Sequence, residues 1–308
     1  MNVGWKLFDE AAHPDLSALG SFLTPLRAFA PAAAADLVHA LRHEIDTTPQ
    51  TITAADRAQN QLIELLLAHD HLSAAFLRVY HGITVAVIDA LERGVLTPKP
   101  FFERLAGRFA ERHFDGLKAE LGLEVATDAA AYGLWRPSFA FDNLERSDNT
   151  PLGIKAAMAH FTVGMCCHIN FDLAIALDLT IRELGYANNP AALEEIERGH
   201  NFVDTILTDK VEGSCELLAA EMACPMSQKI IERGAVKIVG EVSMQMIRRW
   251  RAKTFVHALQ LCSASSEDER AAIRADIYKA GARKTVRLFN TLPSLIEGTL
   301  RGTWLVPT

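Results

Sequence analysis

Cysteine is scarce in the sequence, and no two cysteines stand at a spacing that would bind zinc or form a redox pair. Five occur in 308 residues, two of them adjacent at Cys166 and Cys167. Without a Cys-x-x-Cys motif, neither a cysteine-based zinc site nor a disulfide framework is expected. We expect the cysteines to be buried, reduced thiols. Residues 1–10 also lack a basic region followed by an apolar stretch. No secretory signal is predicted, and a cytoplasmic location is expected.

Positive charge is in the minority. Lys and Arg together number 31 against 38 Asp and Glu, which gives a net charge of -7. A protein whose main partner is a nucleic acid needs a net basic face, so nucleic acid is not expected as a partner. Long apolar runs are missing as well. The segment 83–91 is short and is interrupted by Asp89, and no membrane span is predicted.

Strand patterns and common catalytic motifs are also missing. No run alternates polar and apolar residues for long enough to predict a sheet. There is no P-loop, no G-x-G-x-x-G after a strand and no G-x-S-x-G elbow. Apolar residues recur instead at helical spacing, as Leu37, Leu41 and Ile45 do, one turn apart. The same period runs through segments 54–67, 72–91, 101–121, 152–184 and 271–289. An all-α fold is therefore predicted.

Length and composition favour one domain with a large core. Apolar residues make up 49% of the chain and the mean hydropathy is +0.09. Either the helical core is large, or part of the surface is buried between subunits; we expect a homo-oligomer. The least helical segment, 131–149, carries Trp135, Phe139 and Phe141, which favours a packed aromatic loop over a linker. We expect a single bundle-like domain over 1–308, with residues 1–70 as a candidate peripheral extension.

Two histidine–aspartate pairs carry the main functional signal. His168 precedes Asp172 by four residues, and His200 precedes Asp204 by four, so on a helix each pair lies on one face. Two such pairs on neighbouring helices predict four ligands for one or two divalent metals, zinc or iron first, with magnesium or manganese as alternatives. An Asp one turn after a His can equally hydrogen-bond the imidazole without any metal.

Two further polar residues in the same stretch are candidate catalytic groups. His160 lies eight residues before His168, which separates their backbones by about 12 Å along the helix and makes a shared ion unfavourable. His160 and Asn170 are therefore expected to act on the substrate or on metal-bound water.

The spacing allows two comparisons with known families. A helical H-x-x-x-D followed six residues later by a His resembles zinc-dependent phospholipase C and the single-strand nucleases of the same helical fold. Here His168 and Asp172 are followed by Asp178 in place of that His. This resemblance implies zinc-dependent hydrolysis.

The second comparison covers more of the chain. The run from His160 through Gly164 to HINFDL at 168–173 resembles the signature of domain-of-unknown-function family 5995, a bacterial and fungal family, over about 78–261. That resemblance implies that His160, His168, Asn170 and Asp172 form a functional unit, and it implies no established activity. Cys166 and Cys167 replace the Asn and Ala that the family more often has. His200 and Asp204 stand where it favours Asp and Asn.

Several hypotheses of function follow from these patterns. The first is a metal-dependent enzyme, most simply a hydrolase, acting on a small apolar or anionic molecule; with iron it would be a non-haem oxygenase. A terpene cyclase-like enzyme would use Asp204, Thr208 and Glu212, at the spacing of a magnesium-binding helix, but no D-D-x-x-D partner occurs. The last is a non-enzymatic helical binding or oligomeric interaction protein, in which His168, Asn170 and Asp172 form a buried polar network.

Overall fold

A computed structural model of the chain describes residues 31–69, 71, 73–123, 134–135, 138–139, 152–221 and 235–301. Its elements are α2 (Pro31–His43), α3 (Ile52–Ala68), α4 (Ser73–Glu92), α5 (Lys99–Glu120), α7 (Leu152–Cys167), η4 (His168–Asp172), α8 (Leu173–Glu183), α9 (Pro190–Glu221), α11 (Ala235–Ser263) and α12 (Glu267–Arg301). The described residues contain no strand, which confirms the predicted all-α class.

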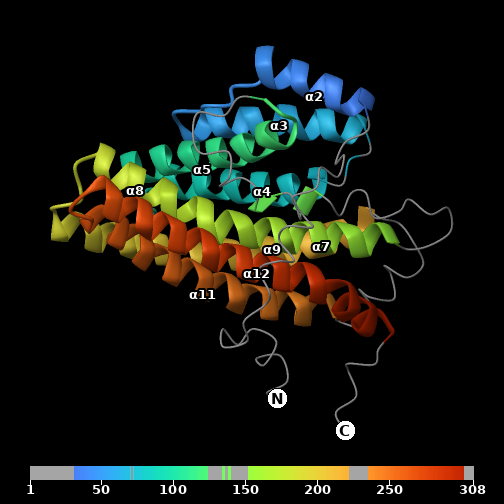
Figure 1. Cartoon of the computed structure of the whole chain (residues 1–308). Coiled ribbons are helices and arrows are strands. Elements are labelled where there is room, and N and C mark those ends of the chain that lie inside the picture. The colour runs from blue at the N-terminus through green and yellow to red at the C-terminus, as the bar shows by residue number, and fades with distance from the viewer. Residues whose placement is uncertain are drawn as a thin grey trace, which may run out of the picture.

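The helices lie side by side in layers (Figure 1). α2 lies on α3, which packs on α4 and α5, while α11 and α12 lie on the opposite side of the molecule; α9 packs against both α4 and α11. Between them runs the segment 152–183, in which α7, η4 and α8 follow one another without a break. This central segment contacts α4 and α5 on one side and α11 and α12 on the other. Its side chains are therefore placed to meet residues from most of the bundle.

Local capping signals set several helix ends. Thr51 Oγ1 accepts the amide of Ala54 at 3.2 Å and begins α3. Pro190 is the first residue of α9, and the side chain of Asn189 accepts the amide of Ala192 at 3.1 Å, as an N-cap followed by proline predicts. These bonds satisfy backbone donors that have no partner within the first turn.

Core packing explains the apolar character of two long helices. By length and composition, Ser73–Glu92 and His160–Glu183 could each cross a membrane. Of the second window, 94% is buried inside the molecule, which is typical of a core helix; of the first, 50% is buried. The predicted packed loop is borne out by its described residues, since Trp135 and Phe139 are fully buried. Phe141 lies outside the described residues.

Candidate functional site

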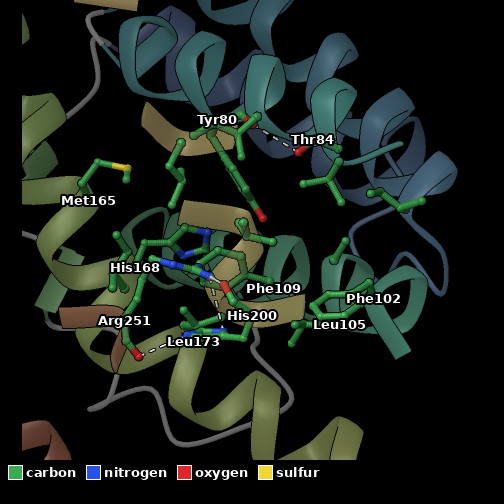
Figure 2. A pocket seen from close by; sticks show the side chains of 17 residues that line it. Tyr80, Thr84, Phe102, Leu105, Phe109, Met165, His168, Leu173, His200 and Arg251 are labelled. Atoms are coloured by element: carbon green, nitrogen blue, oxygen red, sulfur yellow. Dashed lines mark hydrogen bonds between the residues drawn. The ribbon is translucent and has the colours of Figure 1, made fainter. Parts of the chain in front are cut away.

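An apolar cavity of about 90 Å³ lies beside the central segment, between α3, α4, α5, α9 and α11 (Figure 2). Most of its lining is aliphatic or aromatic. The few polar side chains come from three directions: Tyr80 and Thr84 from α4, His168 from η4, and His200 with Arg251 from α9 and α11. An apolar cavity with a small number of convergent polar groups is the usual form of a small-molecule site.

His168 is held by the carboxylate one turn after it. Its Nδ1 lies 2.9 Å from Asp172 Oδ2, and because a carboxylate oxygen accepts, Nδ1 carries the proton. Trp135 Nε1 donates to the same oxygen at 3.0 Å, and Arg112 Nε lies 3.9 Å from the other oxygen. His168 and Asp172 are fully buried. The carboxylate therefore fixes the ring orientation and the tautomer of His168.

The second ring nitrogen of His168, Nε2, differs from the first. Nε2 is buried and has no hydrogen-bond partner among the described residues, and the side chain lines the cavity. With Nδ1 protonated, Nε2 presents a lone pair. A buried polar atom without a partner costs stability, so its retention at a cavity wall points to a ligand or a reacting group there.

Aromatic rings enclose the same imidazole. Phe109 stacks on it, and Tyr80 meets it edge-on with ring centroids 4.7 Å apart. Burial lowers the pKa of His168, because protonation would place a charge in this apolar shell, while the hydrogen bond and charge of Asp172 act in the opposite direction. His168 is therefore neutral at neutral pH, the state in which Nε2 can accept a proton.

A π-helical turn presents this pair to the cavity. The amide of Leu173 bonds to His168 O, five residues back, so the turn is wider than an α-helical one. Side chains donate hydrogen bonds to backbone carbonyl oxygens in and next to this turn. Asn170 Nδ2 donates to Cys166 O at 2.9 Å, and Thr254 of α11 donates to Ile169 O at 2.9 Å. The turn is thus anchored to its own helix and to α11.

His200 and Arg251 form a second polar group on the cavity wall. Arg251 Nε donates to Asp204 Oδ1 at 2.6 Å, and its Nη2 donates to His200 O at 2.6 Å. His200 Nε2 in turn donates to Arg251 O at 3.2 Å. Burial, then the charge of Arg251, lower the pKa of His200 well below its usual value. His200 is therefore a neutral residue that braces Arg251.

The four predicted metal ligands do not form one ligand set in this arrangement. Asp172 accepts hydrogen bonds from His168 and Trp135, and Asp204 accepts one from Arg251. Among the described residues, no group of three or more His, Cys, Asp or Glu side chains is placed to hold an ion. His168 and His200 do line the same cavity. Binding of zinc, iron, magnesium or manganese stays a prediction.

The residues at the cyclase-like spacing, Asp204 and Thr208, also bond to other protein groups. Asp204 pairs with Arg251, and Thr208 Oγ1 donates to Asp204 O at 2.7 Å while accepting from Arg248 at 2.8 Å. The side chain of Glu212 lies outside the described ones. These contacts hold α9 against α11.

The two predicted catalytic residues do not line the cavity. His160 is buried against the loop, where its Nδ1 lies 2.7 Å from Ser138 O. Asn170 points to α12, where Lys284 Nζ donates to its Oδ1 at 2.7 Å. Both side chains therefore tie the central segment to its neighbours, and their predicted role in chemistry stays untested.

Several residues of the site have no clear signal in the sequence. Arg251 stands in a basic run that is typical of a solvated helix end, yet its side chain is buried. Phe109, Trp135 and Arg112 meet His168 or Asp172 only through tertiary packing. The one available signal is the buried Asp172 itself, which requires hydrogen-bond donors from elsewhere in the chain.

Comparison with protein families identifies the chain's relatives. The sequence profile of DUF5995, a family of unknown function, matches residues 52–291, which include every residue that lines the cavity. The chain therefore belongs to this family. The expected core, about 78–261, falls inside the matched range, whereas the resemblance to phospholipase C and the nucleases finds no support. No curated protein and no solved structure matches the chain.

Proposed function

We propose that the protein is an enzyme that hydrolyses a small, largely apolar molecule, with His168 as the general base. The observation that carries this proposal is the asymmetry of one imidazole. Nδ1 is fixed by Asp172 at 2.9 Å, while the buried Nε2 has no hydrogen-bond partner in the described structure and belongs to a cavity wall. A carboxylate-backed, neutral histidine is a common general base in enzymes.

The proposed chemistry uses a water molecule as the nucleophile. His168 Nε2 takes a proton from the water as its oxygen attacks the carbonyl carbon of an ester or lactone, and the carbonyl electrons move to oxygen. Asp172 stabilises the imidazolium that forms. The proton then passes to the leaving oxygen as the carbon–oxygen bond breaks, which returns His168 to the neutral state.

Arg251 is the candidate for stabilising the developing negative charge. Its guanidinium lines the cavity, and its Nε and Nη2 are held by Asp204 and His200 O. The hydrogen bonds described for it leave Nη1 available to a ligand oxygen. A donor fixed in place by other bonds needs no reorganisation when charge appears, and one such donor typically contributes about 10²–10³ in rate.

Hydrolysis of short esters tests the proposal directly. The full chain would be assayed with methyl acetate, ethyl acetate, methyl butanoate and δ-valerolactone, which are compact enough for the cavity, by titration of the released acid, beside His168→Gln. We expect turnover of at least one substrate and loss of it in the variant, with unchanged helicity by circular dichroism. His39→Gln, a change at an exposed histidine, is the matched control. Equal rates in wild type and His168→Gln would contradict the proposal and favour a binding protein.

A metal-dependent version of the same hydrolysis has one observation in its favour. Proteins often orient a metal-binding histidine with a carboxylate on its other nitrogen, as Asp172 does for His168. At most two of the described His, Cys, Asp and Glu side chains could share the ion. Elemental analysis of untagged protein, purified without chelator beside His168→Ala, separates the versions. Near-stoichiometric zinc or iron that vanishes in the variant supports the metal, and no bound metal supports His168 acting as a base.

A further inference from the structure

We infer that the cavity takes a ligand without net charge: a compact apolar molecule with one hydrogen-bond acceptor. The inference deepens the proposed function, on which it rests in taking the cavity as the substrate site. It follows from the charge balance of the cavity wall, from the position of its polar atoms and from its size.

The wall carries a single permanent charge. Of its seventeen lining residues, only Tyr80, His168, His200 and Arg251 have side chains that can titrate. Burial, followed by the nearby charge of Asp172, raises the pKa of Tyr80 well above its usual value, so the phenol is neutral. His168 and His200 are neutral because burial lowers the pKa of both. Arg251 is the remaining charge.

Each charge at or behind the wall already has a counter-charge. Arg251 Nε lies 2.6 Å from Asp204 Oδ1, a direct ion pair. Behind His168, the carboxylate of Asp172 faces Arg112 at 3.9 Å. An anion or a cation that entered the cavity would therefore add a net charge to an apolar, buried space. Such a charge is costly unless a free partner awaits it.

The polar atoms that face the cavity define the rest of the ligand. Arg251 offers donors and no acceptor, so it requires an acceptor on the ligand. His168 Nε2 offers a lone pair and requires a donor, which a water or an N–H group supplies. The volume of about 90 Å³ is smaller than the engineered cavity of about 150 Å³ that holds benzene. A short-chain ester, lactone or amide meets these requirements.

Three probes of matched shape measure this selectivity without any chemistry. Butanamide, butanoate and butylammonium differ mainly in charge at pH 7. Their dissociation constants would be measured by NMR on the full chain, from the shift of the His168 Nε2 resonance in protein with ¹⁵N-labelled histidine. We expect butanamide to bind at least about tenfold more tightly than either ion, which corresponds to about 1.4 kcal/mol.

One substitution should shift the preference toward the anion. Asp204→Asn keeps an oxygen that can accept from Arg251 Nε but removes the counter-charge. We expect butanoate to gain at least about tenfold relative to butanamide in this variant. Glu183→Gln is the matched control, because Glu183 pairs with Arg104 and Arg108 and none of the three lines the cavity. The control should keep the wild-type ranking.

The outcomes separate this inference from the proposed function. Tighter binding of butanoate or butylammonium than of butanamide in the wild type, equal binding of all three, or no binding of any probe would overturn the inference. An unchanged ratio of the butanoate and butanamide dissociation constants in folded Asp204→Asn would do so as well. Failure of the proposed function shows elsewhere, as equal hydrolysis by wild type and His168→Gln, and the probe ranking can hold in that case because it requires no turnover.

Discussion

The imidazole of His168 and the ring of Phe109 lie face to face, with their centroids 3.5 Å apart and their planes within 7° of parallel. Phe109 therefore covers one face of the imidazole and excludes water from it. The ring is also held at its edge by Asp172. A histidine confined in this way has few alternative orientations, so its free nitrogen keeps one direction relative to the cavity.

Asp172→Asn should lower kcat for short aliphatic esters by about 10²–10⁴-fold, as removal of a carboxylate behind a catalytic histidine does elsewhere. The amide can donate to Nδ1, which would favour the tautomer with the proton on Nε2 and remove the base. Steady-state rates beside a thermal unfolding curve would measure the effect. A folded variant that keeps more than half of the wild-type kcat would show that the carboxylate does not serve the proposed base.

Stability should fall as the pH is lowered below about 6.5, the unfolded value for histidine. Burial lowers the pKa of His113, His168 and His200 in the folded protein. Between the unfolded and the folded pKa the unfolded chain binds more protons, so the stabilisation is complete above about 6.5 and is lost as the pH falls toward the folded values. Each histidine contributes about 1.4 kcal/mol per pH unit within that range.

Urea unfolding between pH 7.5 and 5.0 would measure that slope. His113→Asn should make it shallower, because one of the three groups is removed. An unchanged free energy of unfolding across this range in the wild type would contradict the buried, neutral state of these histidines.

Gly116→Ala should destabilise the protein by about 1–3 kcal/mol, as overpacking of a core does. A Cβ at this position of α5 would lie 2.6 Å from Trp135 Cδ1, so the indole that donates to Asp172 must move. We expect lower esterase activity as well. Gly82→Ala in α4 is the matched control, because a Cβ there meets nothing within 4 Å and should stabilise the helix by about 0.5–1 kcal/mol. Similar effects of both changes would show that Trp135 is not held by this contact.

Asn170→Ala should cost about 1–2 kcal/mol of stability and leave kcat within about twofold of the wild type. The change removes the hydrogen bonds to Cys166 O and to Lys284 Nζ, which tie the π-helical turn to α7 and α12. Urea unfolding and ester hydrolysis would be measured on the same preparation. A large loss of kcat in a stable variant would restore Asn170 to the catalytic role that the sequence suggests.

The sequence predicts much of this fold because helical periodicity and caps are local signals. The apolar period over 152–184 and the Asn189–Pro190 start of α9 both appear in the structure at the expected places. The pairing of His168 with Asp172 is also local, four residues apart, and the structure contains it. The spacing does not decide the role of the carboxylate. An Asp four residues after a His can be a metal ligand or a hydrogen-bond partner of the imidazole.

The rest of the site depends on contacts between distant segments. Trp135 reaches Asp172 across 37 positions, and Arg251 reaches Asp204 across 47. No periodicity encodes such pairs, and a basic run such as the one around Arg251 has the same composition whether it is exposed or buried. The π-helical turn cannot be predicted from the sequence for a different reason. Its residues suit an α-helix equally well, and the wider turn is stabilised by side chains such as Thr254 from another helix.

The π-helical turn also has a genetic consequence. A wide turn within a continuous helix accommodates one extra residue, and each residue turns an α-helix by about 100°. Deleting a single codon within 168–172 would allow α7 and α8 to join as one regular helix, and the residues on either side of the former turn would keep nearly their present faces. Leu177 and Asp178 of α8, which are fully buried, would then stay in the core, whereas the spacing between His168 and Asp172 within the turn would be lost. In family members, a one-residue gap at this position should therefore coincide with a different polar arrangement at the cavity.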